Sequence, residues 1–117
     1  MSNEIRYTIK HVGINHRDED EARSTAETLC ALFGLEISQE TPVALFAGEI
    51  FEVMKHDRRG AHGHVALQTD DVEAAMADLR AKGIGFQEDT IRRDEAGRIR
   101  FVYLEQQVAG FAFHLTT

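Results

Sequence analysis

The sequence is short of several features, and each shortage excludes a class of protein. Its one cysteine, Cys30, cannot form a disulfide within the chain, so a reducing, cytoplasmic location is expected. No apolar run is long enough to span a bilayer, and no basic segment leads into an apolar one at the start, so neither a membrane anchor nor a signal peptide is expected. Basic residues are also scarce. The net charge of −7 argues against nucleic acid or an anionic membrane as the main partner.

The remaining composition is typical of a soluble globular protein. Apolar residues make up 43% and charged residues 28% of the 117 residues, which is enough to fold and to dissolve. This length fits one domain with a modest core, or two closely packed half-domains. We therefore expect a single domain that covers residues 1–117.

The stretch from residue 63 to residue 69 organises the rest of the chain. Val65 and Leu67 alternate with the polar His64 and Gln68, which is typical of a β-strand with one apolar face. Good helix N-cap residues follow in 69–71, and a helical pattern begins directly after them. The stretch predicts a strand, a cap and a helix, with a histidine at the start of the strand.

The same arrangement occurs earlier in the chain. Residues 11–15 match residues 64–68 position by position, so His11 corresponds to His64. An acidic cap region and a helical run follow in both places, and each run ends in a glycine, Gly34 or Gly83. The two histidines thus open two similar halves.

Each half is predicted to contain a strand, a helix and three further strands. Helices are expected over residues 22–33 and 72–82. Strands are expected at 6–15, 36–38, 43–47, 50–55, 63–69 and 110–115. In addition, a strand starts at 84–86, and 90–93 and 98–105 form a hairpin around a turn at 94–97. The fold class is therefore α+β. Two βαβββ modules, about 5–56 and about 63–116, form a curved mixed sheet around a central cavity with the helices outside, and a linker over 56–63 joins them.

Four side chains occupy equivalent places in the two halves. His11 and His64 lie on the first strands, and Glu52 and His114 lie on the last, each opposite the apolar face. If the halves pair pseudo-symmetrically, the four converge in one cavity. Three imidazoles and a carboxylate suit a divalent ion such as Zn, Ni, Fe, Mn or Co, and Glu52 could also serve as a catalytic base.

Three further histidines and a group of arginines are alternative candidates for binding a metal or an anion. His16, His56 and His62 lie in polar connections and are expected to be exposed, although His62 shares the parity of His64 and is the main competing ligand. Four arginines flank the predicted 94–97 turn: Arg92, Arg93, Arg98 and Arg100. They indicate either a solvated ribbon with cross-strand ion pairs or, as the less favoured alternative, a clamp for a carboxylate or phosphate.

These motifs resemble the vicinal oxygen chelate superfamily, which includes glyoxalase I, bleomycin resistance proteins and extradiol dioxygenases. The resemblance covers nearly the whole chain and rests on residues 11–14, 51–54, 63–67 and 110–115. It implies paired βαβββ modules and a metal held at the positions of His11, Glu52, His64 and His114. Glyoxalase I usually has a glutamate at the position of His114, so this chain departs from that enzyme.

A narrower resemblance is to a small bacterial subgroup labelled as, or fused with, 2-dehydro-3-deoxyphosphogluconate aldolase. It rests on residues 51–55, 63–66, 88–90, 102–104 and 110–115. The aldolase label is attributed to the fused barrel domain, which this chain lacks. The association suggests sugar-acid or 2-keto-acid chemistry.

Three functions follow from these observations. The first is a metal-dependent lyase or isomerase that acts on a small 2-keto or 2-hydroxy acid. The second is a non-catalytic small-molecule binding module, and the third is an accessory protein of a sugar-acid aldolase. Because a short domain gains from covering its sheet edge, a homodimer is expected, with the site built from one chain or from two.

Overall fold

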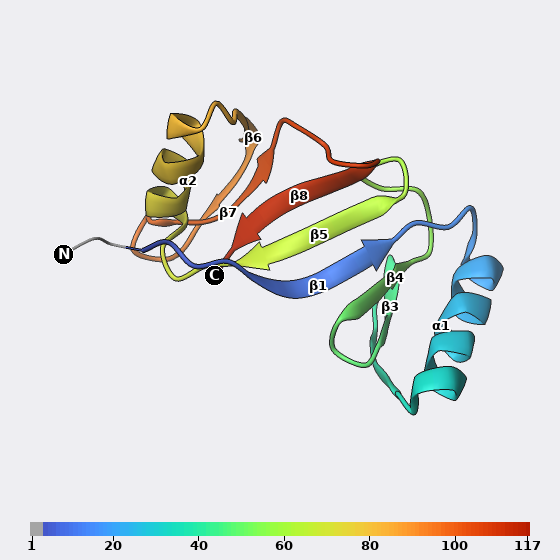
Figure 1. The fold of residues 1–117 in the computed structure, drawn as a ribbon. Coiled ribbons are helices and arrows are strands. Elements are labelled where there is room, and N and C mark those ends of the chain that lie inside the picture. Colours follow the sequence, from blue (N-terminus) through green and yellow to red (C-terminus); the bar gives the residue numbers. More distant parts are fainter. Residues whose placement is uncertain (1–3) are drawn as a thin grey trace.

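The computed structural model describes residues 4–117, which form one continuous eight-stranded sheet and two helices (Figure 1). The first half of the chain contains a strand, a helix and three strands: β1 (Thr8–Ile14), α1 (Glu19–Phe33), β2 (Ile37–Glu40), β3 (Ala44–Ala47) and β4 (Phe51–Met54). The second half repeats this order: β5 (Gly63–Gln68), α2 (Val72–Ala81), β6 (Phe86–Arg93), β7 (Ile99–Leu104) and β8 (Phe111–Thr116). The predicted α+β fold with two βαβββ units is confirmed.

The strand order joins the two halves through their first strands. The order is β2-β3-β4-β1-β5-β8-β7-β6, so β1 and β5 lie side by side in the middle of the sheet. They pair in antiparallel orientation, whereas β1 pairs with β4, and β5 with β8, in parallel. The sheet is therefore mixed, and its four central strands are the first and last strands of the two halves.

The helices lie at opposite ends of the molecule, each against its own half of the sheet (Figure 1). Helix α1 begins three residues before the predicted boundary because the Asp18 carboxylate accepts a hydrogen bond from the Glu21 N–H and caps it there. It ends as predicted at Gly34, whose φ of 68° is left-handed. Neither helix of residues 4–117 is long and apolar enough to cross a membrane.

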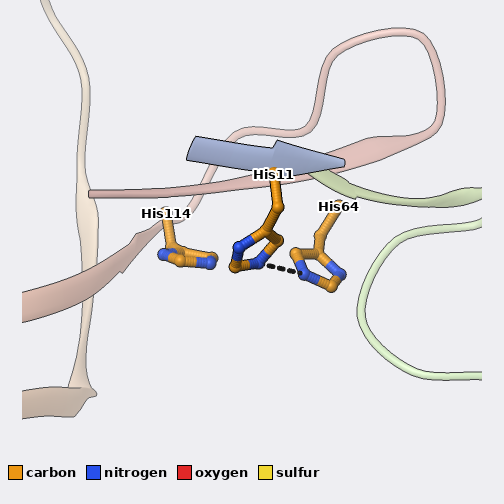
Figure 2. A group of neighbouring side chains, drawn as sticks. All are labelled: His11, His64 and His114. Atoms are coloured by element: carbon orange, nitrogen blue, oxygen red, sulfur yellow. Dashed lines mark hydrogen bonds between the residues drawn. The ribbon is translucent and has the colours of Figure 1, made fainter. Parts of the chain in front are cut away.

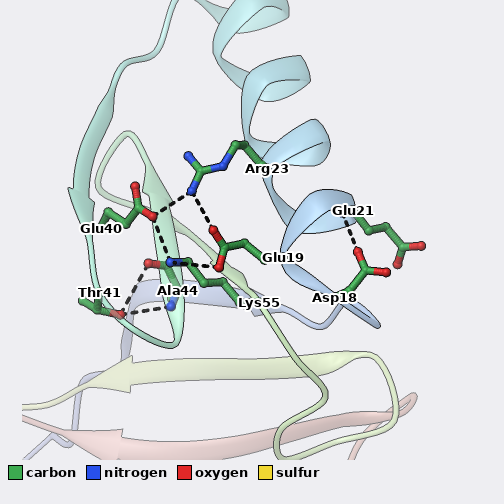
Figure 3. A network of polar contacts seen from close by, with 8 residues as sticks. All are labelled: Asp18, Glu19, Glu21, Arg23, Glu40, Thr41, Ala44 and Lys55. Carbon is green, nitrogen blue, oxygen red and sulfur yellow. Dashed lines mark hydrogen bonds and ion pairs between the residues drawn. The ribbon is translucent and has the colours of Figure 1, made fainter.

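A network of four charged side chains joins α1 to the sheet (Figure 3). The Arg23 guanidinium lies 3.1 Å from Glu19 and 2.8 Å from Glu40 of β2. Lys55, directly after β4, is buried and places its Nζ 2.8 Å from the same Glu40 carboxylate. The buried ammonium is thus paired, and the edge strand β2 is held to both α1 and β4.

Each half has its own apolar core beneath its helix. The core under α1 is small and consists of Ala22, Ala26, Leu45 and Val53. The core under α2 is larger and consists of Val72, Ala75, Met76, Phe86, Val102 and Leu115. Because both cores lie on the helix side of the sheet, the opposite face of the central strands is free for polar side chains.

The chain between residues 84 and 93 differs from its prediction. Two short strands were expected, but β6 is one strand whose register with β7 shifts between Gln87 and Arg92. The Thr90 hydroxyl spans the irregularity, since it donates to the Gln87 carbonyl and accepts from the Tyr103 N–H. A side chain thus replaces the missing ladder bonds, which a periodicity argument does not detect.

Candidate metal centre

The structure brings the four predicted residues together within one chain. They come from four adjacent strands: His11 from β1, Glu52 from β4, His64 from β5 and His114 from β8. The side chains of His64 and His114 are buried, and those of His11 and Glu52 are largely so. Figure 2 shows the three imidazoles converging on one place from three different strands. All four side chains belong to the same chain, which fits the first of the two alternatives left open above.

The donor atoms lie unusually close together. The His64 Nε2 lies 2.9 Å from Glu52 Oε1, and the His11 Nε2 lies 3.3 Å from the same oxygen. The two Nε2 atoms are themselves 3.3 Å apart. A ring nitrogen of His114 lies within 4.8 Å of the corresponding atoms of His11 and His64. Three electron-donor atoms therefore form a tight triangle, with a fourth at its side.

This triangle has the dimensions of a metal-ligand set. With metal–ligand bonds of about 2.1 Å, neighbouring ligand atoms lie roughly 3.0 Å apart in an octahedral site and roughly 3.4 Å apart in a tetrahedral one. The observed separations of 2.9 and 3.3 Å match these edges. In addition, the buried Nδ1 atoms of His64 and His114 have no hydrogen-bond partner in the described residues. The residues present therefore fit a divalent ion.

A glycine makes room for the site. Gly13 on β1 lies between His64 of β5 and Glu52 of β4 in the strand register. A Cβ atom at this position would lie 2.8 Å from the His64 Nε2 and closer still to Nδ1 and Cε1 of the ring. The absence of a side chain at Gly13 thus allows the imidazole to lie across β1 toward Glu52.

The electrostatics of the site favour neutral imidazoles at His11 and His114 and an ionised carboxylate at Glu52. Burial, together with the charges of His64 and His11, lowers the pKa of His114 to about 4. Burial also lowers the pKa of His11, against the opposing effect of Glu52. Burial acts to raise the pKa of Glu52, but the hydrogen bond from His64 and the neighbouring imidazoles outweigh it and hold that pKa below its usual value. Neutral imidazole and carboxylate are the forms that bind metal ions.

Two aromatic rings of β7 pack on the His114 imidazole. The ring centroid of Phe101 lies 4.4 Å from that of His114, and the Tyr103 centroid lies 4.9 Å away. Burial raises the pKa of Tyr103, although the guanidinium of Arg59 opposes this. The phenol therefore stays protonated at neutral pH. The two rings fix the orientation of His114 and cover that side of the site.

The four residues line an open cavity of about 780 Å³. Phe101 and Tyr103 also line it, as do several charged residues: Lys10, Asp57, Arg58, Arg59, Asp89 and Arg92. A cavity of this size accommodates a small metabolite. The converging donor atoms are thus accessible to a ligand and are not sealed inside a core.

The surroundings of the other histidines show that they do not belong to the site. His56 and His62 are exposed as expected, and His62 packs on Phe111 outside the cavity, so it is not a competing ligand. The expectation for His16 was wrong, because it is buried. Its Nδ1 donates to the Met54 carbonyl at 3.1 Å, and its Nε2 accepts from the Thr25 hydroxyl at 2.8 Å. His16 therefore joins α1 to the end of β4.

The arginines around the β6–β7 turn divide into separate roles. Arg92 lines the cavity, with its guanidinium 5.9 Å from the Phe101 ring centroid. Arg93 donates to the Gly97 carbonyl within the turn, and Arg98 lies 3.7 Å from Asp71. All four arginines are exposed, as the solvated ribbon predicts, but within residues 4–117 none forms an ion pair across the β6–β7 hairpin. Of the four, Arg92 alone lines the cavity.

Several residues of the site were not found from the sequence. Phe101 carried no motif, Tyr103 lay in residues 102–104 of the narrower resemblance without an assigned role, and Arg58 and Arg59 lay in the segment interpreted as a linker. Gly13 did carry a detectable signal, because a glycine inside an alternating strand often marks close approach by another group. The others depend on strand order and loop placement, which no local pattern encodes.

Comparisons with known proteins agree on the fold. No protein-family model and no curated protein sequence matches the chain. Among solved structures, a variant of methylmalonyl-CoA epimerase from Streptomyces coelicolor, in complex with 2-nitronate-propionyl-CoA, shares 25% identity. The alignment covers 94% of this chain and 93% of that one, with a TM-score of 0.62.

Two further structures share the fold at lower identity. The methylmalonyl-CoA epimerase from Mycobacterium tuberculosis is 20% identical over 92% of this chain and 85% of its own, with a TM-score of 0.59. A hypothetical protein from Bacillus halodurans C-125 is 15% identical over 94% and 93%, with a TM-score of 0.62. The fold of this chain is thus that of the vicinal oxygen chelate superfamily, to which methylmalonyl-CoA epimerase belongs.

Proposed function

We propose that this protein is a metal-dependent enzyme that acts on a small oxygenated acid. It removes and returns a proton on the carbon atom next to a carbonyl group. The observation that carries the proposal is the triangle of His11 Nε2, His64 Nε2 and Glu52 Oε1, with edges of 2.9 and 3.3 Å, in an open cavity. The similarity to an epimerase supports an isomerase. The resemblance to the aldolase-associated subgroup supports a 2-keto or 2-hydroxy acid as substrate, with lyase chemistry as the related alternative.

In this proposal His11, Glu52, His64 and His114 hold the ion. A divalent ion bound there would polarise a carbonyl or hydroxyl oxygen of the substrate and make the adjacent C–H more acidic. The imidazoles are neutral at pH 7 where burial lowers their pKa, as for His11 and His114. They therefore need not lose a proton when they bind the ion.

Proton transfer falls to the cavity's own side chains. The Glu52 carboxylate is ionised at neutral pH and can accept the proton from the substrate carbon. The Tyr103 phenol keeps its proton because burial raises its pKa, so it can donate to an oxygen that gains negative charge. The packing of Phe101 and Tyr103 on His114 keeps water from this side of the reacting centre. Return of the proton from Glu52 after the planar intermediate has turned its other face toward this carboxyl group gives the epimer, and return to the same face restores the substrate.

Hydrogen exchange in heavy water tests the proposal directly. The metal-reconstituted protein is incubated in D₂O with 2-oxoglutarate, pyruvate or methylmalonyl-CoA, and loss of the C–H signal beside the carbonyl is followed by proton NMR. We expect exchange that a chelator abolishes. Glu52→Gln should remove it, whereas Tyr103→Phe should retain the metal and slow the exchange about 10²-fold or more. Equal exchange with and without metal, or in Glu52→Gln, would contradict the proposal.

A further inference from the structure

We propose that Arg59 and Arg92 form a second binding subsite, which holds an anionic group of the substrate away from its metal-binding end. This inference rests on the proposed function, because it specifies the substrate of the same cavity. It predicts a substrate with two ends, one that offers oxygens to the ion and one that carries a phosphate or a carboxylate.

Both guanidinium groups rest on the aromatic rings beside the metal centre. The Arg59 Cζ lies 4.5 Å from the Tyr103 ring centroid, and the Arg92 Cζ lies 5.9 Å from that of Phe101. These are the two rings that pack on His114. One layer of aromatic side chains therefore separates the donor atoms from two positive charges, and both features line the same cavity.

The two charges are not neutralised by the protein. Four arginines elsewhere form ion pairs with carboxylates: Arg6, Arg17, Arg23 and Arg98. Within residues 4–117, neither Arg59 nor Arg92 forms such a pair, and neither does the adjacent Arg58. The cavity wall also carries three carboxylates, Glu52, Asp57 and Asp89, which its four cations, Lys10, Arg58, Arg59 and Arg92, outnumber by one. In a protein of net charge −7, this local excess of positive charge favours an anion.

The position of Arg59 is fixed by the loop that carries it. Its Nη1 donates to the side-chain oxygen of Gln87 on β6, and this hydrogen bond joins the loop between the halves to the second half. Asn15, directly after β1, donates through Nδ2 to the Gly60 carbonyl at 2.9 Å, and its backbone N–H donates to the His62 carbonyl. Gly60 has a φ of 83°, and a Cβ there would overlap the Gly63 carbonyl. The loop is therefore packed tightly on the sheet, which places Arg59 over the cavity.

This arrangement suits a group with several acceptor oxygens. A guanidinium donates two parallel hydrogen bonds to a phosphate or carboxylate, and stacking on a ring leaves its edge accessible. In Arg59 the contact with Gln87 occupies Nη1, so Nε and Nη2 are the pair that can bind an anion. One group comes from the loop between the halves and the other from β6. The subsite is thus absent from either half alone. The sequence pointed only to Arg92, as part of the less favoured clamp, and gave no sign of Arg59.

Calorimetric titration with simple anions tests the subsite. Inorganic phosphate and succinate are titrated at low ionic strength into the wild-type protein and into Arg59→Gln, Arg92→Gln and Arg93→Gln. Arg93→Gln is the matched control, because it removes the same charge but its side chain binds the Gly97 carbonyl outside the cavity. We expect Arg59→Gln and Arg92→Gln each to raise the Kd about tenfold and Arg93→Gln to leave it unchanged. The anion that binds more tightly identifies the group the substrate carries.

A His64→Ala variant separates this inference from the proposed metal site. If the subsite exists, this variant should lose the metal yet still bind phosphate or succinate, with the same dependence on Arg59. Loss of anion binding in His64→Ala alone would show that the anion binds only at the metal, which overturns the subsite and leaves the metal centre standing. If Arg93→Gln loses as much anion affinity as Arg59→Gln, the anion is attracted by the general positive charge of this region, and the subsite is overturned. A wild-type protein that binds neither phosphate nor succinate would overturn the subsite as well. A protein without metal whose anion binding depends on Arg59 would instead contradict the proposed function.

Discussion

At the scale of single residues, Gly13 is the glycine whose replacement would press directly on a candidate ligand, the imidazole of His64. Gly13→Ala should displace the His64 ring, because the new Cβ would lie 2.8 Å or less from its atoms. We expect metal affinity to fall about tenfold or more, since displacement of a ligand by a neighbouring group has effects of this order. Metal titration of the purified variant measures this.

Gly85→Ala is the matched control for that substitution. A Cβ at Gly85 would meet only the carboxylate end of Glu105, a flexible side chain, so it should leave metal affinity unchanged. If Gly13→Ala binds metal as tightly as the wild type, the ring of His64 is free to move and does not depend on the space above β1.

The buried histidines also predict how stability depends on pH. The pKa of His114 is lowered from 6.5 to about 4, so between these values the unfolded chain binds a proton that the folded one does not. The free energy of unfolding of the metal-free protein should therefore fall as the pH drops from about 6.5 to about 4. His114 alone contributes up to about 3 kcal/mol of this loss.

Urea unfolding at several pH values, with a chelator present, measures this dependence. His114→Gln should flatten the profile, whereas the exposed His56 can be replaced by glutamine without effect. A wild-type protein whose stability does not change between pH 7 and pH 5 would show that His114 is not buried in its neutral form.

At the scale of elements, each helix depends on the core beneath it. Leu115 of β8 is fully buried in the core under α2, one residue from the candidate ligand His114. Leu115→Ala should lower the free energy of unfolding by about 2–5 kcal/mol, because the cavity would not fully collapse. Chemical denaturation provides the measurement. Leu32→Ala, on the exposed side of α1, should change stability by less than about 0.5 kcal/mol. Equal effects of the two substitutions would contradict the observed packing.

Local structure was largely predictable from the sequence, because it depends on neighbouring residues. Alternation of apolar residues located β1 and β5, and the glycine after α1 was found in the predicted left-handed conformation. The correspondence between residues 11–15 and 64–68 led to all four side chains that converge. The burial of His16 and the single long β6 were not predicted, since both depend on contacts between distant segments.

The outer parts of the candidate site could not be predicted for the same reason. Arg59 reaches the cavity and the Tyr103 ring because Asn15 holds its loop and because β8 lies beside β5 and β7 beside β8. Phe101 and Tyr103 support His114 through the pairing of β7 with β8. Sequence patterns indicate which face of a strand is polar, but not which strands become neighbours.

At the scale of the whole molecule, the sheet has an exposed edge. Every residue of β2, the strand at that edge, is exposed, and an unpaired edge favours association with a second chain. We expect a homodimer in solution, with twice the chain mass of 13.2 kDa. Sedimentation equilibrium over a range of concentrations measures this mass, and a single species at the mass of one chain would contradict the expectation.

The central claim is that His11, Glu52, His64 and His114 hold a divalent ion, and elemental analysis by mass spectrometry tests it most directly. The protein is purified without a chelator or a histidine tag, together with His64→Ala and the control His62→Ala, whose side chain lies outside the cavity. We predict close to one equivalent of metal in the wild type and in His62→Ala, and almost none in His64→Ala. No metal in the wild type, and no uptake when Zn, Ni, Mn, Fe or Co is added, would contradict the claim.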